Sequence, residues 1–213
     1  MPAKAMDKVI YIWWSRSGDR RHRDKKLMVL LRNAALNWLL GHQNDRPLLF
    51  RRCLGKPELI PLDGEDKVEF NCSRTSGVVS VAFALKTVVG IDVERIESQP
   101  LSSEMLEIVL SKEEIQEYEQ HGVNERLSYF YELWTRKEAV LKARGVGLQI
   151  PLSAVNVGGV DPTSWQQVIL PDSTIWHVIS LPPVDGVCMA VACDRLVKSI
   201  EVREVSAESL DTA

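Results

Sequence analysis

The sequence is poor in the residues and runs that define several specialised classes of protein. Its 213 residues include only four cysteines and four histidines. The cysteines show neither CxxC spacing nor nearby histidines, so neither a zinc site nor a disulfide framework is indicated, and a reducing cytoplasm is the expected compartment. The longest apolar runs, such as residues 78–85, are far too short to cross a bilayer. The first residues also lack the charged-then-apolar layout of a secretory signal, and we therefore expect no membrane partner.

The composition indicates a class of protein without indicating a function. Hydrophobic residues make up 45% and charged residues 26% of the chain, values typical of a globular protein. The formal net charge of −3 gives no sign of a nucleic-acid-binding protein, although it does not exclude a local basic patch. A chain of this length can hold one large domain or two small domains with a shared core.

Hydrophobic periodicity predicts a mixture of strands and helices. Alternating apolar residues predict the strands, and helical spacing between capping residues predicts the helices. The expected strands are residues 8–14, 68–71, 77–85, 88–94, 176–181, 187–193 and 199–205. The expected helices are residues 27–40, residues 104–110, one that opens at the capping box of Ser111 and Glu114, and one that ends at residue 143 before Gly145.

The two halves of the chain resemble each other faintly. Residues 77–84 and 186–192 share a mixture of bulky and small side chains, and each half has one dominant helix, at residues 25–40 and 128–143. Two related α/β halves packed on each other would explain this likeness, with a functional site in the cleft between them.

The strand at residues 88–94 carries a pair of acidic side chains. Alternation places Asp92 and Glu94 on one face and Ile91 and Val93 on the other. Neighbouring like charges repel unless a positive charge lies between them, and a hard cation with oxygen ligands would supply it. The alternative is a solvated strand end, because Asp-x-Glu alone is a common pattern.

A second pair of charges lies on the helix that ends at residue 143. Glu138 and Lys142 are four residues apart and share one face, which is also the spacing of an ordinary surface ion pair. Trp134 lies one turn earlier, so the pair borders an aromatic side chain, and such a carboxylate and ammonium suit a metal ion and a phosphate.

Residues 19–26 are strongly basic, and they suit either a solvated helix start or a phosphate-binding site.

Two of these segments together resemble the signature of a known enzyme family. Gly90-Ile-Asp-Val-Glu94, followed by residues 130–142 with the sequence FYELWTRKEAVLK, resembles the paired signature of the 4′-phosphopantetheinyl transferases of the surfactin-synthetase-activating type. The likeness extends to Gly55-Lys-Pro57, to residues 70–77 and to residues 111–114, and it covers roughly residues 50–150. Both halves of the signature occur in the right order at about the right separation.

The resemblance implies an α+β fold and a reaction. The fold is a pseudo-dimer of two similar α/β subdomains, each a small antiparallel sheet packed on a long helix, with the active site in the cleft between them. Residues 1–97 would bind the phosphates of coenzyme A, and residues 98–213 would supply the catalytic helix and complete the metal site. The enzyme would transfer the phosphopantetheine arm of coenzyme A to a serine of an apo carrier protein and release adenosine 3′,5′-bisphosphate. The carrier protein would belong to fatty-acid, polyketide or nonribosomal-peptide biosynthesis. The enzyme would be a cytoplasmic monomer with no nucleic-acid partner.

The resemblance also implies roles for individual residues. The magnesium ligands would be Asp92, Glu94 and Glu138. The catalytic residues would be Glu138, Lys142 and Glu114. The coenzyme A contacts would be Arg20, Arg23, Lys56, Ser73, Arg74 and Lys142. The family usually has histidine where this chain has Arg74, and an arginine can bind a phosphate but cannot act as a base.

Two other interpretations remain open at this point. One is a different magnesium-dependent phosphoryl or nucleotidyl enzyme that uses the same carboxylates. The other is a degenerate member that only binds coenzyme A or a carrier protein. The identity of the carrier protein is not indicated by the residues.

Overall fold

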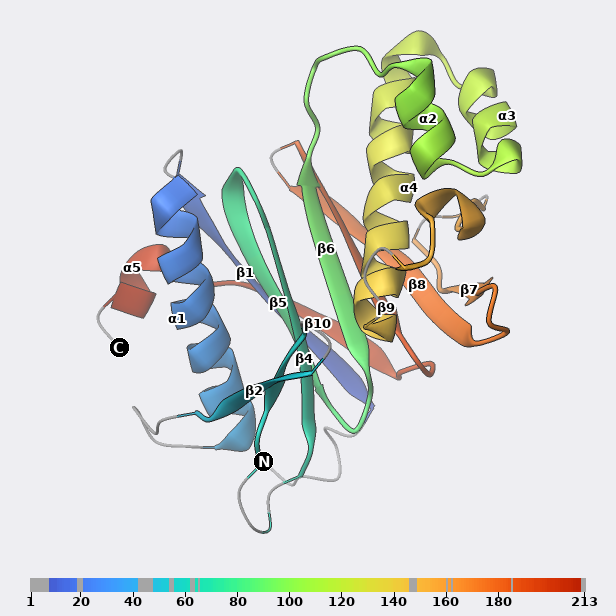
Figure 1. The fold of residues 1–213 in the computed structure, drawn as a ribbon. Helices are drawn as coiled ribbons and strands as arrows, with labels where there is room; N and C mark the ends of the chain where they lie inside the picture. The colour runs from blue at the N-terminus through green and yellow to red at the C-terminus, as the bar shows by residue number, and fades with distance from the viewer. Residues whose placement is uncertain are drawn as a thin grey trace.

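The computed structural model describes residues 8–18, 21–41, 48–53, 56–61, 64, 66–145, 149–159, 161, 163–184 and 186–211, and the structural statements below concern these residues. The chain forms two four-stranded sheets, each with one long helix on its outer face (Figure 1). No helix in these ranges combines the length and apolar character that a membrane span requires.

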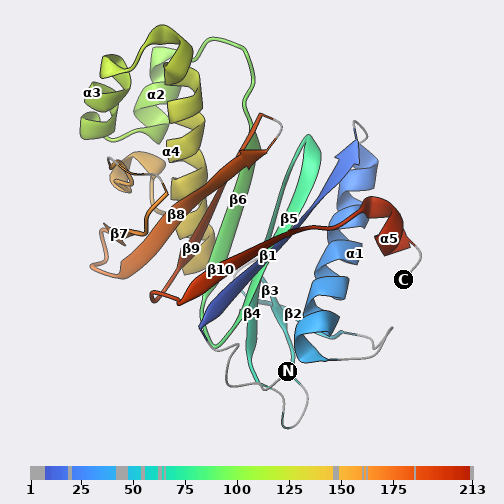
Figure 2. The same cartoon turned by 180° about the vertical axis from the view of Figure 1, so that it is seen from behind.

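The first sheet has the strand order β10-β1-β5-β4. Its strands are β1 (Val9–Gly18), β4 (Val68–Thr75), β5 (Gly77–Leu85) and β10 (Ser199–Glu204). Helix α1 (Arg21–Leu40) covers one face, and the short helix α5 (Ala207–Asp211) lies beside it near the C-terminus (Figure 2). A separate hairpin of β2 (Phe50–Cys53) and β3 (Lys56–Leu59) adjoins β4.

The second sheet has the strand order β6-β9-β8-β7. Its strands are β6 (Val89–Arg95), β7 (Gln166–Ile169), β8 (Ile175–Val184) and β9 (Val187–Cys193). Helix α4 (Val123–Arg144) packs on this sheet and ends at Gly145, whose φ of 77° is left-handed. Helices α2 (Ser103–Val109) and α3 (Lys112–Gln120) and a 3₁₀ turn (Leu152–Ala154) pack beside α4.

Three apolar clusters join these layers in the order helix, sheet, sheet, helix. One lies between α1 and the first sheet, one between the two sheets, and one between α4 and the second sheet. Strand β1 shows the alternation that produces this arrangement, because Tyr11 and Trp13 face α1 while Ile10 and Ile12 face the second sheet. The small side chains of β5 face the second sheet, which explains how closely the two sheets approach.

The predicted α+β pseudo-dimer is confirmed. Each half runs from a strand to a long helix and then to a hairpin, with β1, α1, β4 and β5 in one half and β6, α4, β8 and β9 in the other. The spatial orders β1-β5-β4 and β6-β9-β8 correspond strand by strand. Strands β5 and β9, the segments with the shared composition, are therefore equivalent.

Three details differ from the expectation. The first sheet is not wholly antiparallel, because β10 pairs with β1 in parallel. Strand β4 continues to Thr75, where we expected a strand end after residue 71. Strand β6 belongs to the second sheet although it precedes residue 97, and β10 belongs to the first sheet although it follows residue 98, so the sheets do not divide at that boundary. As a division into functional units, residues 1–97 and 98–213 stay a prediction.

Candidate active site

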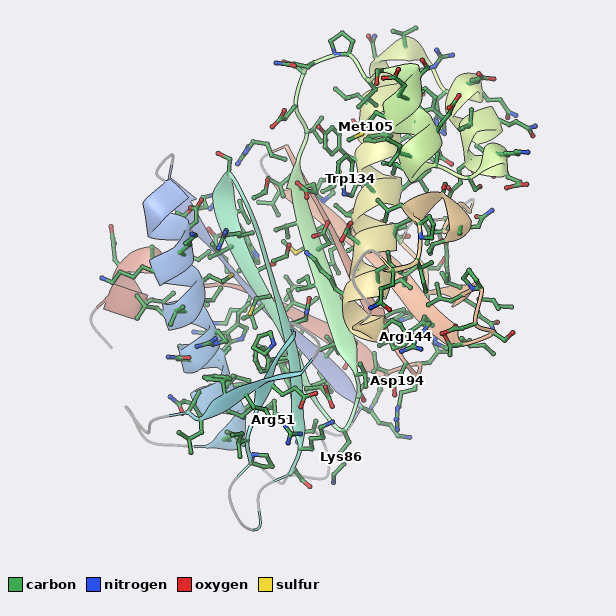
Figure 3. The ribbon with its side chains drawn as sticks, viewed as in Figure 1. Arg51, Lys86, Met105, Trp134, Arg144 and Asp194 are labelled. Carbon is green, nitrogen blue, oxygen red and sulfur yellow. The ribbon has the colours of Figure 1, made fainter. Side chains whose placement is uncertain are left out.

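Helix α4 lies directly against β6 because Gly90 has no side chain. A Cβ atom at this position would overlap the backbone of Ala139 and Ala143 in α4. The close approach brings the face of β6 that carries Asp92 and Glu94 against the middle and C-terminal part of α4. In Figure 3, the labelled side chains of Trp134 and Arg144 bracket this part of the helix.

Asp92 is the buried centre of the site, with 1% of its surface exposed. Its Oδ1 accepts hydrogen bonds from the Ser73 hydroxyl at 2.8 Å and from Lys142 Nζ at 2.5 Å. Its Oδ2 is buried and has no hydrogen-bond partner among the described residues. A buried carboxylate oxygen without a donor is costly, so this atom indicates a position for a ligand of positive charge.

Glu94 and Glu138 complete an acidic cluster around Asp92, and both are half-buried. Burial, followed by the negative charges of Asp92 and Glu138, raises the pKa of Glu94 to about 7 despite the opposing charge of Lys142. Burial and the charge of Asp92 likewise raise the pKa of Glu138. Neighbouring negative charge therefore disfavours the ionised forms of Glu94 and Glu138, as expected where several acids share one site.

Lys142 joins this cluster instead of forming a surface pair on its own helix. Its ammonium donates to Asp92 and, at 2.9 Å, to the hydroxyl of Ser73. Among the hydrogen bonds and ion pairs of the described residues, none joins Lys142 to Glu138. The alternative interpretation, in which Glu138 and Lys142 form an ordinary surface ion pair, is therefore wrong.

The donor set fits a hard divalent cation. Carboxylate oxygens are the ligands that magnesium prefers, and Asp92 Oδ2 is an uncommitted one. No group of three acidic, histidine or cysteine side chains in the described part of the chain converges closely enough to count as a preformed metal site.

Glu114 lies outside this cluster. It is fully buried at the start of α3, where it completes the predicted capping box by accepting from the backbone N–H of Ser111 at 2.7 Å. Its other oxygen accepts from Val157 N–H at 2.8 Å, and its charge is paired with Lys137 at 2.5 Å. The structure therefore does not bring Glu114 together with Asp92, Glu94 and Glu138.

The expected coenzyme A contacts are only partly described. Arg20 lies outside the described residues, and for Arg23 in α1 and Lys56 in β3 only the backbone is described. Arg74 is exposed on the face of β4 that also carries Phe70 and Cys72, which pack towards α1. Ser73 alternates with it, is buried, and faces β6 instead.

Three residues that shape the site are not indicated by sequence reasoning. Gly90 lies within a signature segment, and its role is clear only from its contact with α4. Asn71 and Thr75 bind the backbone of β6 through their side chains, at 3.1 Å to Ile91 N–H and 3.1 Å to Arg95 N–H. The alternation of polar residues at positions 71, 73 and 75 was the available signal for a strand with one polar face.

Comparison with known proteins identifies the family. Residues 88–192, which carry the acidic cluster and Lys142, match the model of the 4′-phosphopantetheinyl transferase superfamily. The chain is 32% identical over 157 residues to the 4′-phosphopantetheinyl transferase Sfp of Bacillus subtilis (strain 168), covering 73% of this chain and 67% of that protein. It is 29% identical over 196 residues to a putative 4′-phosphopantetheinyl transferase of Synechocystis, covering 85% and 78% of the two chains. It is also 31% identical over 131 residues to the transferase gsp of Aneurinibacillus migulanus, covering 62% and 51%. As the resemblance predicted, the chain belongs to the 4′-phosphopantetheinyl transferase superfamily.

Proposed function

We propose that this enzyme transfers the 4′-phosphopantetheine arm of coenzyme A to a serine of an apo acyl or peptidyl carrier protein in a magnesium-dependent reaction that releases adenosine 3′,5′-bisphosphate. The observation that carries the proposal is the buried, unpartnered Oδ2 of Asp92. This oxygen lies in the segment that matches the family, beside two further carboxylates and a lysine.

Asp92, Glu94 and Glu138 would hold the magnesium ion. Burial and the charge of Asp92 raise the pKa of both half-buried glutamates, so both gain from a cation that compensates their charge. When bound, magnesium supplies positive charge that neutralises the pyrophosphate of coenzyme A and the charge that develops during transfer.

Lys142 acts on the phosphates in this proposal. An ammonium has three donors, of which one goes to Asp92 and one to Ser73, so one remains for a phosphate oxygen. Its side chain is 31% exposed, so a ligand can reach it. A fixed ammonium of this kind stabilises the negative charge that builds up as the carrier serine attacks.

Glu138 is the candidate base for the proton of the incoming serine. Its raised pKa makes it a stronger base than an ordinary carboxylate, and it lies on the same helix face as Lys142.

The phosphates of coenzyme A would be bound by Arg20, Arg23, Lys56 and Arg74. Glu114 has a structural role in this scheme because its hydrogen-bonding capacity is used within the protein.

The test combines the purified protein with coenzyme A, magnesium chloride and a panel of apo carrier proteins from fatty-acid, polyketide and peptide synthesis. Intact mass spectrometry should show one phosphopantetheine added to at least one carrier protein, and chromatography should show equimolar adenosine 3′,5′-bisphosphate. Asp92→Asn, which retains the shape of the side chain, and an excess of EDTA should both abolish the product.

The outcomes separate the other interpretations. A nucleotide product other than adenosine 3′,5′-bisphosphate would indicate a different phosphoryl or nucleotidyl transfer. Tight binding of coenzyme A by calorimetry without modification of any carrier protein would indicate a binding module. A carrier protein modified equally well in EDTA would contradict the magnesium dependence alone.

A further inference from the structure

The hydroxyl group of Ser73 has no hydrogen-bonding capacity left for a ligand. It donates to Asp92 Oδ1 at 2.8 Å, and it accepts from the Val93 N–H at 3.3 Å and from Lys142 Nζ at 2.9 Å. A serine hydroxyl offers one donor and two acceptor positions, so all three are filled within the protein. The side chain is also buried. A phosphate of coenzyme A could bind Ser73 only by displacing one of these partners.

Ser73 is the middle member of a row of side chains that joins the two sheets. Asn71 accepts from the N–H of Ile91, and Thr75 accepts from the N–H of Arg95, each across 20 residues of sequence, as Ser73 does with Val93. Strand β6 is an outer strand of the second sheet, and these three side chains satisfy N–H groups on its open edge. The row therefore fixes β6 against β4, and we name these three residues the β4 row.

Within the described part of the structure, Ser73 is the member of the β4 row that contacts Asp92 and Lys142. Both donors, Ser73 Oγ and Lys142 Nζ, bind the same oxygen of Asp92, which leaves Oδ2 uncommitted and fixes the orientation of the carboxylate. The same hydroxyl holds the Lys142 ammonium with one donor still available.

We infer that Ser73 is a positioning residue, which orients the metal ligand Asp92 and the phosphate-binding Lys142, and that it is not a contact for coenzyme A. The inference rests on the proposed function of this site. It changes the role that family resemblance suggests for Ser73, while Arg74, exposed on the other face of β4, keeps its role in binding coenzyme A.

The test measures metal binding and coenzyme A binding separately. The affinity for Mn²⁺ is measured by electron paramagnetic resonance without coenzyme A, and the affinity for coenzyme A is measured by calorimetry in EDTA. Ser73→Ala should weaken Mn²⁺ binding by about tenfold or more, as the loss of a hydrogen bond to a metal ligand does, and should lower kcat. Its affinity for coenzyme A in EDTA should stay within about twofold of the wild type, since the hydroxyl has no free capacity. Ser73→Cys, which is close to serine in shape but forms weak hydrogen bonds, should also weaken Mn²⁺ binding. This second variant keeps the test valid if Ser73→Ala fails to fold.

Two matched variants make the result specific. Thr75→Val removes one hydrogen bond of the β4 row without touching Asp92 or Lys142, and its Mn²⁺ affinity should stay within about twofold, as for a bond outside the site. Arg74→Ala should weaken coenzyme A binding in EDTA and leave Mn²⁺ binding unchanged.

Four results would overturn the inference. Unchanged Mn²⁺ affinity in Ser73→Ala with weaker coenzyme A binding would make Ser73 a ligand contact. Equal losses of Mn²⁺ affinity in Thr75→Val and Ser73→Ala would assign the effect to the joint between the sheets. A wild-type protein that neither binds Mn²⁺ nor modifies a carrier protein would overturn the proposed function, and the inference with it; an active, Mn²⁺-binding wild type with indistinguishable Ser73 variants would overturn the inference alone.

Discussion

Two lysines of helix α4 are each paired with a carboxylate on another element, and the two pairs differ in how much of their hydrogen-bonding capacity is filled. The pair of Lys137 with Glu114 is sealed, with side-chain exposures of 0% and 1%. The ammonium of Lys137 uses its three donors on Glu114 and on the carbonyls of Leu152 and Val155. Glu114 accepts from two backbone N–H groups as well. This pair fastens α3 and residues 152–157 to α4, and nothing in it is left for a ligand.

The pair of Lys142 with Asp92 has the same ions but an open arrangement. One carboxylate oxygen has no partner among the described residues, one ammonium donor remains, and the lysine is partly exposed. A buried ion pair can therefore have either a structural or a functional role. The donors and acceptors that it leaves without a partner within the protein indicate a functional one. Removing charge should therefore reduce stability at the sealed pair and reduce chemistry at the open pair.

The largest effect is expected from Lys137→Met. It leaves Glu114 charged, buried and unpaired, and breaking such a pair from one side destabilises a protein by about 3–5 kcal/mol. The free energy of unfolding is measured by urea denaturation at neutral pH. The double variant Lys137→Met with Glu114→Gln should recover much of the loss, because glutamine removes the charge and can still accept from Ser111. A Lys137→Met protein with wild-type stability and no transfer would place Lys137 in the active site.

Lys142→Ala should act on the rate. Loss of one preorganised donor lowers turnover by about a hundredfold or more, equivalent to about 2.7–4 kcal/mol of transition-state stabilisation. Lys142→Arg should recover only part, because a planar guanidinium does not replace a compact ammonium. The measurement is kcat at saturating coenzyme A and magnesium, with coenzyme A affinity expected to change less than the rate. Turnover of Lys142→Ala near the wild-type value would return this residue to a structural role.

Gly90→Ala tests the packing that creates the open pair. The added methyl group would meet the backbone of Ala139 and Ala143, and overpacking of this kind destabilises a protein by about 1–3 kcal/mol. Because α4 must move away from β6, the affinity for Mn²⁺ should fall as well. Thermal unfolding and Mn²⁺ titration check the two effects. If both stayed at wild-type values, the helix would have room to spare at this contact.

Much of the fold could be predicted because local patterns encode it. The alternation in β5 and β6, the capping box of α3 and Gly145 at the end of α4 all specify their elements within a few residues of sequence. The pairing of β10 with β1 could not be predicted, because alternation defines the faces of a strand and not its neighbours. The same limit explains why alternation did not indicate that β6, which precedes residue 97, pairs within the second sheet.

The candidate site was predicted in part for the same reason. Strand alternation and helix spacing placed Asp92 and Glu94 on one face and Glu138 and Lys142 on another, and the structure brings these faces together. The segment around Ser73 has the composition of a turn, but it continues as a strand paired with β5, and the Ser73 side chain binds the distant backbone of β6. Glu114 was placed in the site by resemblance, and only the packing of α3 against α4 shows that Lys137 neutralises it.

The smallest effect is expected from Glu138→Gln, and its sign is the test. Burial and the charge of Asp92 raise the pKa of Glu138 in the folded protein, so its ionised form opposes folding at pH 8 and less so as the pH falls. In EDTA, glutamine should therefore increase the free energy of unfolding, because it removes a charge that burial and Asp92 disfavour. With magnesium at about a hundred times its dissociation constant, the wild type should gain about 2.7 kcal/mol and the variant much less, so the order of stability reverses. Glu132→Gln is the control on the same helix, because it breaks the pair with Arg136 and should lower stability equally with and without magnesium. If Glu138→Gln is less stable than the wild type in EDTA, or gains as much from magnesium, Glu138 belongs with the sealed pair and is not a ligand.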